Sequence, residues 1–209
     1  MSRVVVVGGG GHAKVVISVL KRSGWEVLGF TDERERGPVL TVPYLGTDAV
    51  LPGLVGVEGR CDAVVGVGKV DASPARISVW GRLKDLGFSL PAVVSPSSIV
   101  NEAVDLGEGT FVGDGVVVNS GTSTVAICIL NTHCTVEHDC RLGDNVHVAP
   151  GATISGGVTV GDNCMIGAGA TVIQGVTICA GVLVGAGATV VKDLRVPGTY
   201  VGIPARRAS

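Results

Sequence analysis

Three of the four histidines lie close together in the C-terminal half, and two carboxylates flank one of them in the run Glu137-His138-Asp139. An imidazole titrates near neutrality, so His138 can accept the proton that an amine or hydroxyl loses as it attacks a thioester. Asp139 or Glu137 would orient the ring and stabilise its cationic form. This pattern predicts acyl transfer with His138 as general base. The alternative is that these turns simply tolerate polar residues, which we favour for His133.

An acyl transfer also needs a hydrogen-bond donor for the oxyanion that develops on the thioester carbonyl. A backbone N–H group can serve without a dedicated side chain, and Gly156 and Gly157 are the candidates. A leaving thiolate needs little acid assistance, so one base suffices.

A glycine-rich segment near the N-terminus, Gly8-Gly9-Gly10-Gly11-His12, lies between an apolar run and a helical pattern. Free N–H groups at a helix N-terminus favour phosphate, so Gly8, Gly10, Gly11 and His12 are predicted to bind a diphosphate. A tight turn without a ligand is the competing interpretation.

Three further residues could complete this phosphate site. Asp32 ends the second predicted strand, where a carboxylate can reach a ribose or a base, although it could equally be a solvated turn residue. Gly68 follows the third predicted strand, and Arg76 on the next predicted helix could contact a phosphate. An exposed helical arginine without a ligand is an equal alternative for Arg76.

The elements that position the glycine-rich segment alternate between strands and helices. Apolar spacing predicts strands at 3–7, 26–31 and 62–67, and helices at 13–23 and from Ser73-Pro74 to about residue 86. This order predicts an α/β domain with a small parallel, Rossmann-like sheet and right-handed crossovers over residues 1–90.

The elements that position His138 follow a different rule, a period of six. Seventeen of the eighteen residues at six-residue spacing from Val94 to Val196 are Val, Ile or Leu. Hexapeptide repetition predicts a parallel β-helix over residues 91–209, with three hexapeptides in each triangular coil. The frame is expected to hold to its end.

A second position of the repeat, four residues after the aliphatic one, carries only small side chains from Thr110 to Ala188. Four of the six cysteines occupy it: Cys128, Cys134, Cys140 and Cys164. These cysteines are predicted to be small apolar fillers at tight corners rather than disulfides or metal ligands.

Composition limits the partners. The formal net charge of −2 gives no basic field for nucleic acid, and aromatic residues make up only 3% of the chain. No apolar run is long enough to cross a membrane, and the apolar start is too short for a signal peptide, so a cytoplasmic location is expected.

The run from Asn131 through Glu137-His138-Asp139 to His147, followed by Gly156-Gly157, resembles the bacterial nucleotide-sugar N-acetyltransferases and sialic-acid O-acetyltransferases of the hexapeptide-repeat superfamily. The resemblance covers nearly the whole chain. It implies a left-handed β-helix, His138 as general base with Asp139 as its acidic partner, His147 near the thioester, and Asn131 lining the site.

The same resemblance implies substrates and assembly. It implies acetyl-CoA bound along the β-helix of a homotrimer, and a nucleotide-linked 4-amino-deoxy sugar bound by the glycine-rich segment. Lys69 departs from the Gly-Asp-Asn or Gly-Asn-Asn of many relatives, so the nucleotide and the sugar stay open. The expected contacts of acetyl-CoA are His147, Gly156, Ala168, Ala186 and Arg206.

Other functions compete with N-acetylation. O-acetylation of a sialic-acid-like sugar would use the same base. His133, His138 and His147 could instead bind zinc across an interface, as in trimeric β-helical carbonic anhydrases, although no metal is expected here. A silent sugar-nucleotide sensor is a third possibility, which the intact Glu137-His138-Asp139 run disfavours.

Overall fold

The computed structural model describes residues 3–35, 37–55, 61–71, 73 and 75–208. Contacts within the chain divide it into two units, one formed by Met1–Lys69 with Ser73–Pro96 and the other by Val70–Ala72 with Ser97–Ser209. None of the helices in the described ranges has the length and apolar character that a membrane crossing requires.

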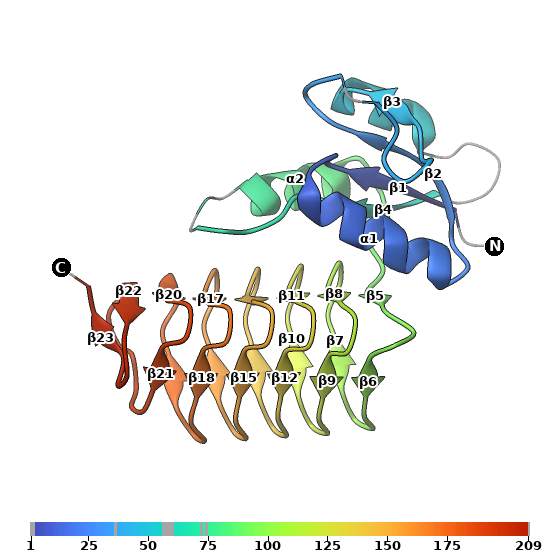
Figure 1. The fold of residues 1–209 in the computed structure, drawn as a ribbon. Coiled ribbons are helices and arrows are strands. Elements are labelled where there is room, and N and C mark those ends of the chain that lie inside the picture. Colours follow the sequence, from blue (N-terminus) through green and yellow to red (C-terminus); the bar gives the residue numbers. More distant parts are fainter. Residues whose placement is uncertain (1–2, 36, 56–60, 72, 74, 209) are drawn as a thin grey trace. The chain divides into compact units, whose positions relative to one another are not determined.

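The first unit is a four-stranded parallel sheet with the strand order β3-β2-β1-β4 (Figure 1). Its elements are β1 (Arg3–Val7), α1 (Gly11–Arg22), β2 (Glu26–Thr31), β3 (Tyr44–Gly46), the 3₁₀ helix η1 (Asp48–Leu54), β4 (Cys61–Val65), α2 (Ala75–Asp85) and the short β5 (Val93–Val94). The central strand β1 and the inward face of α1 bury an aliphatic core, so the sheet edge at the carboxyl ends of the strands is firmly positioned.

The bounds of the strands and helices agree in part with those predicted from the sequence. The predicted strands 3–7 and 26–31 match β1 and β2, whereas α1 begins at Gly11, two residues before the predicted start. Strand β4 ends at Val65, so Gly66 to Gly68 lie in the loop after it. The predicted helix cap at Ser73-Pro74 falls partly outside the described residues, and the Ser73 hydroxyl accepts a hydrogen bond from the Ala75 amide (3.3 Å).

The second unit is a parallel β-helix whose strands stack at an interval of eighteen residues (Figure 1). Each triangular coil contributes one short strand to each of three sheets. One sheet contains β7 (Asp105–Leu106), β10 (Ser123–Thr124), β13 (Arg141–Leu142), β16 (Thr159–Val160) and β19 (Thr177–Ile178). The second contains β6 (Ile99–Val100), β9 (Val117–Val118), β12 (Thr135–Val136), β15 (Thr153–Ile154), β18 (Thr171–Val172) and β21 (Thr189–Val190).

The third sheet includes β8 (Phe111–Val112), β11 (Ile129–Leu130), β14 (His147–Val148), β17 (Met165–Ile166), β20 (Val182–Val184), β22 (Gly198–Val201) and β23 (Arg206–Arg207). Strand β23 pairs antiparallel with β22 at the C-terminal end of the stack. The second residue of nearly every coil strand fills the interior, and the first faces outward. This alternation is the physical origin of the six-residue period.

The small corner position is buried as predicted, and its cysteines are free thiols. Several of them also donate weak hydrogen bonds to carbonyl groups of the following turns, as Cys128 does to Gly143 (3.1 Å) and Cys140 to Ser155 (3.2 Å). Burial raises the pKa of Cys134 to about 12. The Cys134 thiol therefore stays protonated at neutral pH, and all four cysteines pack the corners.

The six-residue frame was wrong at its end. Val196, the last predicted interior position, is 50% exposed, whereas Leu194 is 2% exposed and pairs with Ile178 sixteen residues earlier. Strand β22 keeps the same shortened interval, since Tyr200 pairs with Val184. The last coil is thus two residues shorter than the others, because the chain leaves the repeat to form the closing β22–β23 hairpin.

A carboxylate at one coil corner should reduce stability at neutral pH. Partial burial, and secondarily the charge of Asp162, raise the pKa of Asp144, whose Oδ1 has no hydrogen-bond partner among the described residues. The folded chain therefore binds this proton more tightly than the unfolded chain, and the free energy of unfolding falls as pH rises through the raised pKa. Asp144→Asn should increase the melting temperature at pH 7, and the gain should shrink toward pH 4.

Thermal unfolding followed by circular dichroism at both pH values tests this. The control is Asp105→Asn, which removes an exposed carboxylate from the outer surface of strand β7. An equal change for the two variants, or a gain for Asp144→Asn that does not depend on pH, would contradict the assignment.

Candidate active site

His138 and Asp139 form a bonded pair on the turn that follows strand β12. Nδ1 of His138 lies 2.9 Å from Oδ2 of Asp139, and the two side chains are 63% and 73% exposed. Asp139 adopts a left-handed backbone conformation (φ 59°), which short polar side chains tolerate. A carboxylate accepts hydrogen bonds only, so Nδ1 carries the ring proton and Nε2 presents its lone pair.

The backbone of this turn is fixed by the coils on either side. The Asp139 amide donates to the Ser120 carbonyl (3.1 Å), and the Gly157 amide donates to the His138 carbonyl (2.9 Å). The Gly157 N–H group is therefore committed to the coil and cannot serve as the predicted oxyanion donor. Gly156 stays as the candidate for that role.

Two glycines leave the space that the His138–Asp139 pair occupies. A Cβ atom at Gly156, eighteen residues after His138, would lie 2.5 Å from Nε2 of the imidazole. A Cβ atom at Gly121, eighteen residues before Asp139, would lie 2.6 Å from its Oδ1. Sequence reasoning selected Gly156 for its N–H group and missed Gly121, although the eighteen-residue interval identifies both.

Filling the space at Gly156 should displace the imidazole ring of His138. Its backbone φ is one that alanine adopts, so Gly156→Ala should fold while the added methyl group pushes the imidazole away from Gly156. We expect kcat for acetyl transfer to fall by about tenfold or more, because misplacement of a reacting group by about 1 Å can cost about 100-fold.

Thiol release measured at saturating substrates tests this expectation. The control is Gly175→Ala, which adds a methyl group at a left-handed corner (φ 70°) with open space around it and should reduce stability rather than rate. An unchanged kcat for Gly156→Ala would show that the ring position observed here does not matter for turnover.

Glu137 takes part in a different arrangement from Asp139. Its Oε2 accepts a hydrogen bond from Nδ2 of Asn119 (2.9 Å), and Oδ1 of Asn119 accepts one from Asn101 (2.7 Å). These three residues occupy the same position in successive coils and form a polar ladder, which sequence reasoning missed. Of the two carboxylates beside His138, the ring bonds to Asp139, and Asn119 holds Glu137.

Asn131 and His147 form a second bonded pair, between the end of β11 and strand β14. Nδ2 of Asn131 lies 3.1 Å from Nε2 of His147, and His147 is almost fully buried. The Oδ1 atom of Asn131 accepts a hydrogen bond from the Thr132 amide (2.8 Å), which fixes the orientation of the amide group. The local backbone therefore directs Nδ2 of Asn131, the hydrogen-bond donor, toward Nε2 of His147.

The zinc alternative gains no support from the described part of this chain. The described residues contain no group of three or more His, Cys, Asp or Glu side chains that could hold a metal ion. His133, the third ligand of that hypothesis, has a left-handed backbone and packs its ring over Gly115.

The residues predicted to contact acetyl-CoA all belong to the second unit. Ala168 and Ala186 are exposed corner residues eighteen positions apart, and Gly156 is half-buried. Arg206 in β23 is exposed, and its guanidinium donates to the Ala205 carbonyl (2.9 Å).

The glycine-rich segment lies at the carboxyl end of β1 in the first unit. Gly8 has a φ of 109°, and a Cβ atom there would lie 3.0 Å from Val67. A Cβ atom at Gly68 would lie 3.3 Å from that of His12. The loops after β1 and β4 thus meet through glycines, and Gly10 precedes the first turn of α1, where N–H groups are available to an anion.

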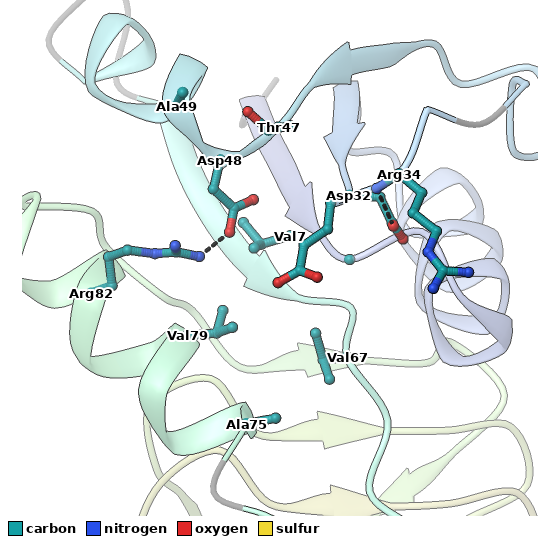
Figure 2. Close-up of a pocket in the computed structure, with 12 residues that line it drawn as sticks. Val7, Asp32, Arg34, Thr47, Asp48, Ala49, Val67, Ala75, Val79 and Arg82 are labelled. Carbon is teal, nitrogen blue, oxygen red and sulfur yellow. Dashed lines mark hydrogen bonds and ion pairs between the residues drawn. The ribbon is translucent and has the colours of Figure 1, made fainter.

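A cavity of about 680 Å³ opens at the same edge of the sheet (Figure 2). Gly8 and Asp32, two of the residues predicted to bind the nucleotide, line it. Asp32 is not simply solvated, because its Oδ2 accepts a hydrogen bond from the Gly9 amide (2.9 Å) and its Oδ1 one from the Arg34 amide (3.1 Å). It therefore fixes the glycine-rich segment as well as facing the cavity.

Arg76 is not the exposed helical arginine that was the alternative to a phosphate contact. Its side chain is buried, and Nη1 donates a hydrogen bond to the Val67 carbonyl. The guanidinium thus holds the loop after β4, and the cavity lining does not include it. The charged cavity residues that sequence reasoning missed include Asp48 and Arg82, which form an ion pair.

Known proteins match both units. Residues 3–72 match the PglD N-terminal domain, and residues 157–192 match the bacterial transferase hexapeptide repeat. A GDP-perosamine N-acetyltransferase from Escherichia coli O157:H7 is 37% identical over 65 residues, which are 31% of this chain and only 29% of that protein.

Solved structures match the whole chain. The perosamine N-acetyltransferase of Caulobacter crescentus, crystallised with CoA and GDP-perosamine as a histidine-to-asparagine mutant, is 39% identical with a TM-score of 0.93, over 100% of this chain and 98% of that one. The acetyltransferase domain of PglB from Neisseria gonorrhoeae is 34% identical with a TM-score of 0.93, over 100% of both chains. The chain therefore belongs to the nucleotide-sugar N-acetyltransferases of the hexapeptide-repeat acyltransferase superfamily.

Proposed function

We propose that this chain transfers the acetyl group of acetyl-CoA to the 4-amino group of a nucleotide-linked amino-deoxy sugar. The observation that carries the proposal is the exposed imidazole of His138, which is oriented by Asp139 and lies against Gly156. Relatives crystallised with CoA and GDP-perosamine support the two substrate classes.

The chemistry assigned to each residue follows from this geometry. Nε2 of His138 accepts a proton from the sugar amine as the amine nitrogen attacks the thioester carbonyl carbon. Asp139 stabilises the resulting imidazolium through Nδ1–H. The Gly156 N–H group donates to the oxyanion, which collapses as the carbon–sulfur bond breaks and CoA leaves as thiolate. The imidazolium then returns its proton to that thiolate, and His138 is restored.

The two halves divide the binding work in this proposal. Residues 1–90 bind the sugar nucleotide in the cavity beside Gly8 and Asp32, with the diphosphate at the amides of Gly10, Gly11 and His12. Residues 91–209 bind acetyl-CoA and carry the base. Asn131 and His147 line the thioester site, the corner residues Gly156, Ala168 and Ala186 contact the pantetheine, and Arg206 meets a CoA phosphate.

We also propose a cytoplasmic homotrimer that serves bacterial polysaccharide biosynthesis. The outward residues of one β-helix sheet support assembly, since they form a flat row of β-branched side chains: Ile99, Val117, Thr135, Thr153, Thr171 and Thr189. Such a row packs readily against another copy of itself. Light scattering on the purified chain measures the oligomeric state, and a monomer at working concentration would reject the trimer.

Thiol release from acetyl-CoA with a panel of nucleotide amino sugars tests the function. The expected result is rapid release with at least one 4-amino sugar and none with its 4-hydroxy analogue. Acetylation of a hydroxyl in place of the amine would assign the chain to the O-acetyltransferases instead. Absence of release with every sugar would reject acetyl transfer to this substrate class.

A further inference from the structure

The cavity of the first unit has apolar walls that suit a flat ring. Val7 at the end of β1, Val67 after β4 and Val79 in α2 line it, together with small residues such as Ala49 and Ala75 (Figure 2). Its volume of about 680 Å³ lies within the usual range for sites that enclose small organic ligands. Apolar walls give affinity for a ring but do not distinguish one nucleobase from another.

A fixed ion pair supplies the polar part of the same cavity. Oδ2 of Asp48, at the start of η1, pairs with Nη2 of Arg82 in α2, and both residues line the cavity (Figure 2). Oδ1 of Asp48 also accepts a hydrogen bond from the buried Thr31 hydroxyl (2.5 Å). The carboxylate is therefore held from two sides, while Arg82 is about half exposed.

The pair still has hydrogen-bonding capacity to offer a ligand. A carboxylate accepts about four hydrogen bonds and a guanidinium donates five, and the contacts above use only part of this capacity. The carboxylate of Asp48, an acceptor, therefore lies beside the guanidinium of Arg82, a donor, and the positions of η1 and α2 fix their order. This arrangement complements a ligand edge that carries a carbonyl oxygen next to a ring N–H group.

Nucleobases divide into two classes by that edge. Uracil and thymine present O4 beside N3–H, and guanine and hypoxanthine present O6 beside N1–H. Cytosine and adenine present an amino donor beside an unprotonated ring nitrogen, which reverses the order. A base whose ribose is fixed elsewhere cannot reverse its edge without turning over in the cavity.

We propose that Asp48 and Arg82 read the nucleobase and select nucleotides with an oxo base over those with an amino base. The inference rests on the proposed function, because it requires the sugar nucleotide to occupy this cavity. Asp32 and the glycine-rich segment then serve the ribose and the diphosphate, and the Asp48–Arg82 pair serves the base.

Equilibrium titration of the full chain with two matched pairs of nucleotides tests the proposal. UDP and CDP differ only at the relevant edge, as do IDP and ADP. We expect the oxo member of at least one pair to bind about tenfold or more tightly than its amino partner, since unpaired polar groups in a site reject an analogue strongly. This comparison uses the unaltered chain and does not depend on any variant folding.

Variants then assign the selectivity to the pair. Asp48→Asn and Arg82→Gln should each reduce the preference to about threefold or less, because one hydrogen bond to a charged group is lost. Glu26→Gln is the matched control. Glu26 pairs with Arg3 (3.9 Å) at the amino ends of β2 and β1, whereas the cavity lies at the carboxyl ends. The Glu26→Gln variant should therefore retain the full preference. Thermal unfolding checks that all three variants are folded.

The outcomes separate this inference from the function on which it rests. Equal binding of UDP with CDP and of IDP with ADP would overturn the base-reading role, even if acetyl transfer proceeds normally. Selectivity that survives in both Asp48→Asn and Arg82→Gln would also overturn it. Selective nucleotide binding without any thiol release would instead reject the proposed acetyl transfer and leave the base-reading pair in place.

Discussion

Replacing His138 with alanine should lower kcat for acetyl transfer by a factor on the order of 10² to 10⁴, which is the usual contribution of a positioned general base. The structure supports a loss of this size because His138 is the residue of the bonded pair that can take up a proton. Asp139 occupies Nδ1, so Nε2 is the proton acceptor, and it lies on the Gly156 side of the ring. Thiol release at saturating acetyl-CoA and sugar nucleotide measures kcat directly.

The His138 experiment has a matched control in His133. His133 also lies at a coil corner, with a left-handed φ of 55° that asparagine adopts readily. His133→Asn should retain kcat within about threefold, since polar corner substitutions without a chemical role have small effects. Both variants should keep the wild-type melting temperature within a few degrees. A His138→Ala enzyme with wild-type kcat would remove His138 from the mechanism.

The β-helix and the contact between His138 and Asp139 were predictable because both depend on short-range patterns. One aliphatic residue in six must fill the narrow interior, so the period runs through the sequence from β6 to β21 with Thr124 as the single exception. His138 and Asp139 are adjacent in the chain, and their contact needs only a turn. The last coil departed from the period because strand β22 pairs two residues early, which no local pattern indicates.

The cavity of the first unit was only half predictable, for a physical reason. The segment between β2 and β4 contains a three-residue strand and a 3₁₀ helix, both too short to show a period. Asp48 therefore had no element to which it could be assigned. No local pattern distinguishes Arg82 from Arg76 in α2, and only tertiary packing places one at the cavity and buries the other.

The polar ladder and the spacing glycines were missed although the sequence contains them. Asn101, Asn119 and Glu137 are eighteen residues apart, as are Gly121 and Asp139. The eighteen-residue interval relates polar residues at the coil corners as well as aliphatic residues in the interior. In a β-helix every residue stacks on the residue one coil away, so the turn that carries His138 and Asp139 depends on glycines in both neighbouring coils.

The second large effect should be a loss of stability, caused by replacing an interior residue of the coil next to the turn that carries His138. Ile154 in β15 is fully buried, and its carbonyl accepts a hydrogen bond from the Glu137 amide (2.9 Å). Val136 and Val172 pair with it in the coils on either side. Ile154→Ala should lower the free energy of unfolding by about 2–5 kcal/mol, since a narrow interior cannot collapse to fill the cavity.

The next strand along the chain provides the control, because Thr159 of β16 is exposed and lies outside the row proposed for assembly. Thr159→Ala should cost about 1 kcal/mol or less, the usual span of strand propensity. Urea unfolding at one fixed protein concentration measures both losses, and the fixed concentration keeps the contribution of assembly the same for both variants. Equal losses at the two positions would mean that the interior does not hold the coils together. A larger loss for Ile154→Ala, with kcat unchanged at low temperature, would show that Ile154 contributes to stability and not to the position of the turn that carries His138.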